Sequence, residues 1–190
     1  TKLRINLLMA CLFIFANIIS LNIKADNEPN NNIGQAESLA LKSSVSGALG
    51  YLINTVTDGQ DFYVITVPKD GRLTIWETVS GALLGGINIK DANGTDLSWG
   101  AGWQNKTDSC YYANLKAGTY YLEVYNFGSS QGSYSITAKY WAAKYDTETE
   151  PDNTYQQANT VSLNSAFTAH VGYSNAINGT DDNDYYKIVL

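Results

Sequence analysis

Apolar and polar residues alternate along several segments between residues 60 and 140. An alternation of period two is typical of β-strands that bury one face, because successive side chains of a strand point to opposite sides of the sheet. The segments DFYVITV, GRLTIWETV, GTYYLEVYN and GSYSITAKY all show it. Their predicted inward-facing sets are Tyr63, Ile65 and Val67; Leu73, Ile75 and Val79; Tyr120, Leu122 and Val124; and Tyr134, Ile136 and Ala138.

Turn-forming residues separate these segments, at 68–71, 91–94, 116–118 and 129–132. The clearest turn signal is Asn93-Gly94, because both residue types tolerate a positive φ. An open stack of hairpins could not bury the apolar faces of so many strands. The pattern therefore predicts an all-β fold, an antiparallel β-sandwich of about seven or eight strands.

The chain contains two similar openings, 122 positions apart. EPNNNIGQAESLAL begins at Glu28, and EPDNTYQQANTVSL begins at Glu150. Each opening leads to a second acidic cluster, which is DGQDFY from Asp58 in one case and DDNDYY from Asp181 in the other. A repeated motif order of this kind predicts tandem copies of one domain.

The repeat also predicts the domain boundaries. We expect a complete first sandwich at 26–140, a linker at 141–149 where the alternation is interrupted, and a truncated second copy at 150–190. The last residues, YYKIVL, read as part of a strand. We therefore expect the 190 residues to belong to a longer protein.

The first 25 residues have the features of a secretory signal peptide. Lys2 and Arg4 precede an apolar run at 7–21, and Ala25 is a small residue at the predicted cleavage point. A transmembrane anchor is one alternative, although the run is short for a full span. Lipoprotein attachment at Cys11 is another, although most of the apolar run follows that cysteine. The predicted location is extracellular or on the cell surface, with no membrane contact after cleavage.

The charge balance narrows the choice of partners. The chain has 12 basic and 18 acidic residues and a net charge of −6. Lys2, Arg4 and Lys24 are the only charged residues of the predicted signal peptide, so the remainder has 9 basic and 18 acidic residues and a net charge of −9. Such a surface repels nucleic acid and anionic membranes, so neither is an expected partner. It suits divalent cations.

Few residues could carry catalysis. Cys110 is the only cysteine after the predicted signal peptide and His170 the only histidine, so no intrachain disulfide and no Ser-His-Asp or Cys-His pair can be drawn within the first domain. A zinc site also lacks ligands. We interpret Cys110 as a small buried hydrophobe and His170 as an outward-facing strand residue. No enzymatic activity is expected of these residues.

Six motifs follow one another in a fixed order: EPN-x(5)-A, G-x-L-G-Y, D-x-x-D-[FY]-Y, DGRLTI, AGTYYLEV and GSYSITA. This order resembles the bacterial pre-peptidase C-terminal domain family, which includes the collagen-binding domains of clostridial collagenases. The likeness covers nearly all of the chain after residue 25, once fully and once partially. It implies a jelly-roll-like β-sandwich that is attached to secreted enzymes, commonly proteases, and is not itself catalytic.

The acidic residues near each opening could supply oxygen ligands to calcium, which takes six to eight of them. Pro151 favours an extended Glu150, and an extended segment sends Glu148, Glu150 and Asp152 to one side. The aspartates of DDNDYY would approach from the loop before the next strand. The alternative is that these side chains only cap turns through their own backbone.

The resemblance implies a specific set of calcium ligands, because the collagen-binding members use an E-x-E-P-N-D segment together with D-x-x-D. Asp stands at the first Glu position of the first copy, and Asn at the last acidic one, so this site is expected to be the weaker. The second copy has D-N where those members have N-D. The implied ligands are Asp26, Glu28, Asn30, Asn31, Asp58 and Asp61 in the first copy, and Glu148, Glu150, Asp152, Asn153, Asp181 and Asp184 in the second.

Aromatic residues form a second candidate site. The alternation predicts that Trp76, Tyr121 and Tyr125 face away from the core, and Trp99 and Trp103 fall in a Gly-rich loop. Exposed rigid aromatics favour a ligand-facing surface. The alternative is that both faces are partly covered, or that the loop tryptophans close one end of the sandwich.

Three functions remain open from the sequence. The first is a non-catalytic secreted module that binds an extracellular protein or polysaccharide polymer, or that tethers and orients an attached enzyme. The second is the accessory region of a secreted peptidase or other hydrolase whose catalytic domain lies outside these residues. The third is a surface adhesin built from tandem sandwiches.

Overall fold

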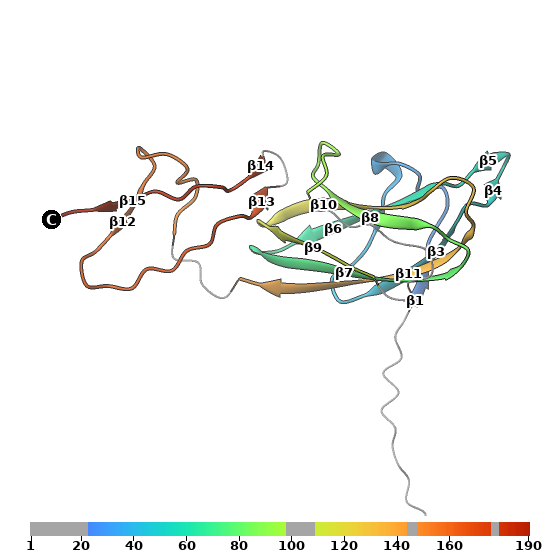
Figure 1. The fold of residues 1–190 in the computed structure, drawn as a ribbon, viewed down its shortest axis with the longest axis horizontal. Helices are drawn as coiled ribbons and strands as arrows, with labels where there is room; N and C mark the ends of the chain where they lie inside the picture. The colour runs from blue at the N-terminus through green and yellow to red at the C-terminus, as the bar shows by residue number, and fades with distance from the viewer. Residues whose placement is uncertain (1–22, 98–108, 144–147, 176–178) are drawn as a thin grey trace, which may run out of the picture.

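The computed structural model describes residues 23–97, 109–143, 148–175 and 179–190, and Figure 1 shows their arrangement. The described residues form strands and one 3₁₀ turn, η1 (Ile33–Gln35), with no α-helix among them. None of these segments is a helix long and apolar enough to cross a membrane. The all-β class expected from the alternation is confirmed.

Two sheets enclose the core (Figure 1). The smaller one has the order β2 (Glu37–Ser38), β6 (Gln60–Val67), β10 (Gly118–Asn126), β8 (Gly85–Lys90). The larger one has the order β1 (Ile23–Ala25), β3 (Ser44–Leu49), β11 (Gly132–Ala142), β7 (Gly71–Gly81), β9 (Ser109–Leu115), β13 (Ser174–Asn175), β14 (Gly179–Thr180). Two further pairs are β4 (Leu52–Ile53) with β5 (Val56–Thr57) and β12 (Asn159–Val161) with β15 (Tyr186–Ile188).

From β6 to β11 the chain passes to the other sheet after every strand. Neighbours within a sheet are therefore distant in sequence, and β10 lies between β6 and β8 while β7 lies between β11 and β9. All four of these pairings are antiparallel. This crossing connectivity is what makes the two sheets a sandwich with one shared core.

The predicted inward residues fill the space between the sheets. All of them are buried except Val79, which packs against the core from a partly exposed position. The inward row of β7 also includes a carboxyl group, because Glu77 lies between Ile75 and Val79 and is only 3% exposed. Tyr111 Oη donates a hydrogen bond to Glu77 Oε2 (3.1 Å), and burial raises the pKa of this carboxyl.

The predicted turn at Asn93-Gly94 is confirmed. Asp91 Oδ1 accepts hydrogen bonds from the backbone N–H groups of Asn93 and Thr95, each at 2.8 Å. Gly94 has a φ of +82° and its N–H donates to Asp91 O (3.1 Å). This is the local side-chain capping that aspartates commonly provide in turns.

The residues just before the predicted cleavage point belong to the larger sheet. β1 pairs in parallel with β3, with Lys24 opposite Val45, and the Lys24 ammonium forms an ion pair with Glu37. At the other boundary β11 continues to Ala142, two residues into the predicted linker. The strand pairing therefore extends slightly beyond both limits of the predicted first domain.

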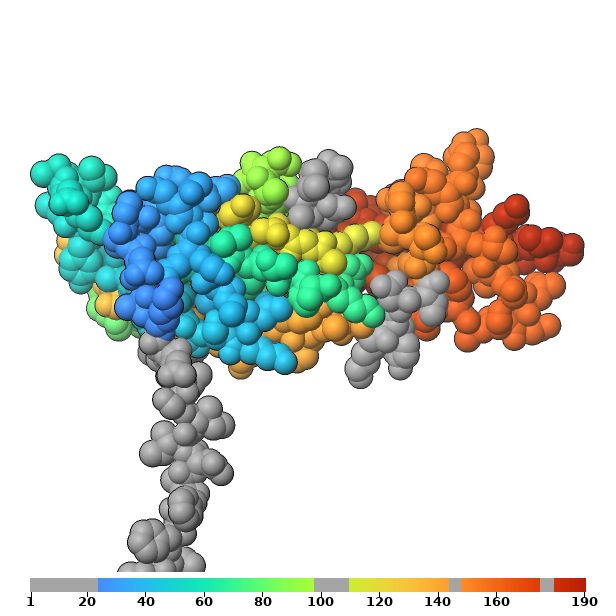
Figure 2. All heavy atoms as spheres, turned by 180° about the vertical axis from the view of Figure 1, so that it is seen from behind, coloured from blue at the N-terminus to red at the C-terminus, as the bar shows by residue number. Residues whose placement is uncertain are grey.

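The residues after 148 contact one end of the sandwich, where Figure 2 shows them in orange and red. β13 pairs in parallel with β9 through Ser174 and Leu115, so the larger sheet continues across the junction. The carbonyl oxygen of Ser174 accepts hydrogen bonds from Tyr120 Oη and Lys116 N, both at 2.9 Å.

Candidate cation-binding site

The first acidic cluster joins the start of the domain to the body of the sandwich. Asp26, Glu28 and Asp61 each place a carboxylate oxygen within 4.8 Å of the others. Asp26 follows β1 and is tied to β3 by a hydrogen bond from its N–H to Ser46 O (3.0 Å). Asp61 is the second residue of β6. Residues 35 positions apart thus supply one cluster.

The asparagines of the first opening lie beside this cluster. Asn30 is fully buried, and its backbone carbonyl accepts a hydrogen bond from Phe62 N (2.8 Å), which fixes the opening next to β6. Among the described residues, neither side-chain polar atom of Asn30 has a hydrogen-bond partner, and neither does Asn31 Oδ1. A buried amide without partners is costly, so the side-chain oxygens of Asn30 and Asn31 are candidate ligands for a cation.

Asp58 is 1% exposed and is positioned by its own backbone. Its N–H donates to Tyr51 O (2.8 Å), and its carbonyl accepts from Gly50 N (2.6 Å). Gly50 has a φ of +87°, and a Cβ there would lie 2.0 Å from Ser130 O, so this turn requires glycine. Neither carboxylate oxygen of Asp58 accepts a hydrogen bond from a described residue.

Two buried tyrosines orient Asp61. Tyr134 Oη donates to Asp61 Oδ2 and is also hydrogen bonded to Tyr63 Oη. Asp26 Oδ2 lies near the same two hydroxyls, 3.4 Å from Tyr63 Oη and 3.5 Å from Tyr134 Oη. The second oxygen of Asp61, Oδ1, has no donor among the described residues. The tyrosines therefore contact one oxygen of each carboxylate and leave Asp61 Oδ1 without a donor among the described residues.

The electrostatics of the first cluster and the neighbouring Asp58 disfavour four negative charges. Burial raises the pKa of Asp58 to about 7, and the nearby Glu28 carboxylate adds to the shift. Burial also raises the pKa of Asp61, and the hydrogen bond from Tyr134 only partly counteracts it. The pKa values of Asp26 and Glu28 are raised, again mainly by burial. A divalent cation would reverse this balance by stabilising the ionised forms.

The second cluster has the same design. Glu150, Asp152, Asp181 and Asp184 each bring a carboxylate oxygen within 4.8 Å of the others. Asp152 is fully buried; its Oδ2 accepts a hydrogen bond from Asn159 Nδ2 (2.7 Å), and no described residue donates to its Oδ1. Asp184 Oδ1 also lacks a donor within the part of the chain that the structure describes. With its amide nitrogen turned toward the cluster, Asn153 donates to Asp181 Oδ1 (3.0 Å).

The backbone around the two clusters is hydrogen bonded in the same way. Phe62 N donates to Asn30 O in the first, and Tyr185 N donates to Asp152 O in the second. The paired bonds between Gly50, Tyr51 and Asp58 also recur, between Gly172, Tyr173 and Asp181. In both segments the opening pairs in parallel with the strand that follows the acidic loop, as β2 with β6 and as β12 with β15.

Among the described residues, a lysine contacts the carboxylates of the second cluster but not those of the first. Lys116, in the turn between β9 and β10, places its ammonium 2.7 Å from Glu150 Oε1 and 3.4 Å from Asp181 Oδ2. Burial alone would raise the pKa of Glu150, but the Lys116 ammonium offsets this and leaves that pKa lowered. Burial and a hydrogen bond with Glu150 raise the pKa of Asp181 to about 6. The first sandwich thus supplies a cation to the second cluster.

Replacing this lysine should strengthen metal binding at the second cluster. A metal ion that enters must displace the Lys116 ammonium from Glu150, so we expect Lys116→Met to raise the calcium affinity there about tenfold, or about 1.4 kcal/mol. Isothermal titration calorimetry of both proteins measures this change. Lys139→Met, on a surface away from both clusters, is the control and should leave the affinity unchanged. An unaltered affinity in Lys116→Met would show that the ammonium does not compete.

Glu148 lies outside the second cluster and faces the only histidine instead. Its Oε1 accepts a hydrogen bond from His170 N (2.9 Å) and lies 3.1 Å from His170 Nδ1. The other ring nitrogen, His170 Nε2, is 3.1 Å from Asp70 Oδ2 of the first sandwich. The expectation of an outward strand histidine is therefore wrong, because His170 is half-buried at the junction and lies outside the strands.

Cys110 is exposed on β9, contrary to its predicted burial, because it falls on the outward row.

The aromatic candidates are spread over different surfaces. Trp76 is 43% exposed on the outer face of the larger sheet, whereas Tyr121 and Tyr125 are half-buried on the outer face of the smaller one. Tyr125 packs edge-on against Phe127, with ring centroids 5.2 Å apart. Trp99 and Trp103 lie outside the described residues.

Two further exposed aromatics were not predicted, although the strand alternation could have identified them. Tyr112 on β9 and Trp141 on β11 share the outer face with Trp76, each 53% exposed. Both occupy outward positions of the alternating pattern, since Tyr112 lies between the buried Tyr111 and Ala113, and Trp141 follows the inward-facing Tyr140.

Comparison with known proteins gives a limited result. No family model matches the chain, and no curated protein matches it. Among solved structures, the chain is similar to the pre-peptidase C-terminal domain of a collagenase from Bacillus anthracis, with 21% identity, 60% of this chain and 100% of that chain covered, and a TM-score of 0.48. It is also similar to PliG of Aeromonas hydrophila, a periplasmic inhibitor of g-type lysozyme, with 14% identity, coverages of 55% and 97%, and a TM-score of 0.31. At these values the fold assignment rests on the strand pairing described above.

Proposed function

We propose that this chain is a non-catalytic module of a secreted protein, that it binds calcium at its acidic clusters, and that it tethers or orients an attached extracellular enzyme or binds an extracellular polymer. One observation carries the calcium part. Asp58, Asp61, Asp152 and Asp184 all have carboxylate oxygens that are buried and accept no hydrogen bond from the described residues.

The turn-cap alternative explains these oxygens poorly. Asp91 shows what capping looks like in this protein, since its Oδ1 accepts two backbone N–H groups. Asp58 accepts none with either oxygen, although it also stands in a loop. Burying a carboxylate without a donor is costly, and close negative charges add repulsion. A calcium ion would remove both penalties, and the oxygen-rich ligand set suits it.

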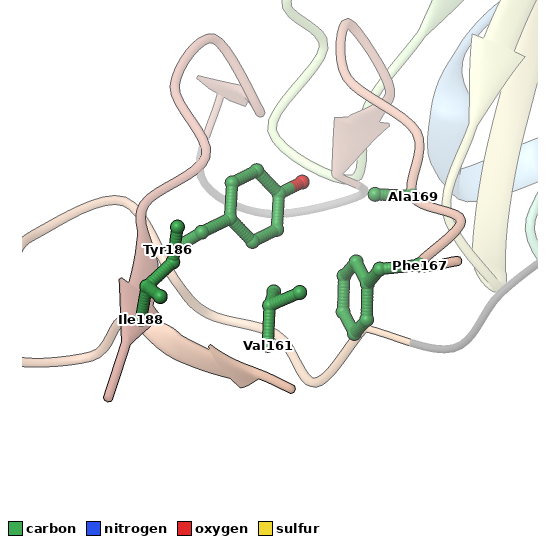
Figure 3. Close-up of a pocket in the computed structure, with 5 residues that line it drawn as sticks. All are labelled: Val161, Phe167, Ala169, Tyr186 and Ile188. Atoms are coloured by element: carbon green, nitrogen blue, oxygen red, sulfur yellow. The ribbon is translucent and has the colours of Figure 1, made fainter. Parts of the chain in front are cut away.

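The second cluster belongs, on this proposal, to a second sandwich that begins after the linker. An apolar pocket of about 310 Å³ is lined by Val161, Phe167, Ala169, Tyr186 and Ile188 (Figure 3). In the repeat alignment four of these residues stand where the first sandwich has its core residues Leu39, Val45, Tyr63 and Ile65.

Those first-sandwich residues are at most 5% exposed, whereas Tyr186 and Ile188 are 43% and 59% exposed. The pocket is therefore better explained as part of a second core than as a ligand site. On this view the residues from 150 onward would not form a stable unit alone, because a third of a sandwich cannot bury its apolar face.

The position of the clusters suggests what the calcium is for. In the first cluster Asp26 and Glu28 come from the start of the domain, whereas Asp61 comes from the sandwich. A shared cation would therefore pin the preceding segment to the body of the domain. The second cluster lies at the junction, where a cation would fix the angle between successive domains.

Calorimetric titration of the chain with calcium chloride at pH 8 tests the proposal. The parent should bind at both clusters, Asp58→Asn/Asp61→Asn should lose one site, and Asp181→Asn/Asp184→Asn should lose the other. Asp182→Asn is the matched control, because Asp182 is an exposed residue of the same acidic loop. A parent that binds no calcium would contradict the proposal and leave the acids as structural residues.

A further inference from the structure

The outer face of the larger sheet combines three exposed aromatics with two basic residues. Trp76 and Arg72 lie on β7, Tyr112 on β9, and Trp141 on β11. The fifth residue is Lys139 of β11. Because β7 pairs with both β9 and β11, these side chains occupy three adjacent strands. We call these five residues the outer patch.

The strand register places the outer patch in consecutive rows. Trp141 is directly opposite Arg72 across the β11–β7 pair, and Lys139 is opposite Thr74, which is in turn opposite Tyr112. Trp76 occupies the next row. Rows on one face are about 7 Å apart along a strand. Thr74, at the centre, is only 6% exposed, so the surrounding long side chains form a continuous surface over the sheet.

The two cations of the patch lie on its aromatic rings. Arg72 Cζ is 3.8 Å from the centroid of the Tyr112 ring, and Lys139 Nζ is 5.3 Å from the Trp76 ring. Contacts of this length are cation–π interactions, which hold the charged groups in place without neutralising them. The positive charges therefore remain available to a ligand.

The charge of this face is opposite to that of the whole chain. The outward positions of β3, β7, β9 and β11, as far as the structure describes them, contain no Asp or Glu, and their only charged residues are Arg72 and Lys139. The chain as a whole has a net charge of −6. A locally positive face on an acidic protein selects for a negatively charged partner through electrostatic complementarity.

We infer that the outer patch binds a carboxylated polysaccharide, with the aromatic rings against the apolar faces of the sugar rings and with Arg72 and Lys139 on the carboxylates. The patch places two cations among three aromatic side chains. This alternation suits a polymer in which each sugar carries about one carboxylate. Arg in particular can form two parallel hydrogen bonds to one carboxylate. This inference deepens the polymer-binding part of the proposed function and rests on it only for an extracellular location.

Other anionic partners fit this face less well. Peptides usually bind to an open sheet edge, a groove or a pocket, whereas β7 and β11 are interior strands whose backbone groups are already paired. Single-stranded nucleic acid also stacks on aromatic rings, but it requires a strongly positive protein surface. A flat face with rigid rings and few charges is more suited to a chain of acidic sugars.

This inference is tested by measuring the binding of polygalacturonate to the chain by calorimetry in a buffer with chelator. The chelator prevents calcium from bridging the polymer to the acidic clusters. The parent should bind polygalacturonate and not neutral dextran, with an affinity that falls as salt is added. Trp76→Ala/Trp141→Ala and Arg72→Gln/Lys139→Gln should each weaken binding at least tenfold.

A control variant on other surfaces, Tyr125→Ala/Lys187→Gln on β10 and β15, should bind within twofold of the parent. Circular dichroism melts verify that each variant is folded. Equal binding to dextran, to a dT20 oligonucleotide or to poly-glutamate would overturn the inference, as would an equal loss in the control variant. If the protein binds calcium but not polygalacturonate, this inference alone is wrong. If it binds polygalacturonate but no calcium, only the calcium part of the proposed function is wrong.

Discussion

At pH 8 the chain should melt about 10 °C lower in a chelator than in calcium at a hundredfold excess over its dissociation constant. A ligand at that concentration stabilises the folded state by about 2.7 kcal/mol. For a domain of this size the corresponding shift in the melting temperature is about 10 °C. The physical source is the set of buried, closely spaced carboxylates in the first cluster, which repel one another when no cation is bound.

The same shift should nearly vanish at pH 5. In the cation-free protein the pKa of Asp58 is raised to about 7 by burial and by Glu28, so its protonated form favours folding. That contribution is fully present below pH 4 and is lost as the pH rises to 7 and beyond. Calcium must displace the same protons, so its affinity increases over this range. Thermal melts at pH 5, 6.5 and 8, with calcium and with chelator, measure both trends, and coincident melts at pH 8 would contradict them.

The second large effect concerns the stability of Asp58→Asn/Asp61→Asn relative to the parent, which should change sign between chelator and calcium. In chelator at pH 8 we expect this variant to be more stable than the parent, because Asp58, whose pKa is raised to about 7, is then a buried charge without a counterion, and the substitution removes it. In calcium we expect it to be less stable than the parent, because two ligands of the cation are missing. Few structural substitutions stabilise a protein in one buffer and destabilise it in the other.

Urea denaturation in both buffers measures the free energy of unfolding for this comparison. Asp96→Asn is a suitable control, because Asp96 is an exposed aspartate paired with Lys90, away from the cluster. It should shift the stability in the same direction in both buffers. A double variant that is destabilised equally with and without calcium would mean that Asp58 and Asp61 serve only to hold the loop.

The sequence predicted the features that depend on short-range pattern. The inward row of β10 follows from alternation, because Tyr120, Leu122 and Val124 are separated by a period that a strand must keep. The grouping of Glu28 with Asp61 was expected from the repeated motifs and the family resemblance. The rows of Tyr63 and Tyr134 were also expected to be inward, although not their hydrogen bonds to Asp61.

The features that the sequence did not predict depend on which strands are neighbours. Nothing in the segments around Arg72, Tyr112 and Trp141 indicates that β7, β9 and β11 are adjacent, because register is set by pairing between distant segments. The ion pair between Lys116 and Glu150 is hidden for the same reason. Glu148 was included with the ligands from the extended spacing and the family resemblance, and the structure turns it toward His170 instead.

The narrow junction described above has a mechanical consequence. One residue pair, Ser174 with Leu115, joins β13 to β9, whereas β11 and β7 are paired over eleven residues. Segments with few hydrogen bonds open at a lower free energy than densely paired sheets. When the two ends of the chain are pulled apart, the junction should therefore open before the paired strands of the first sandwich separate.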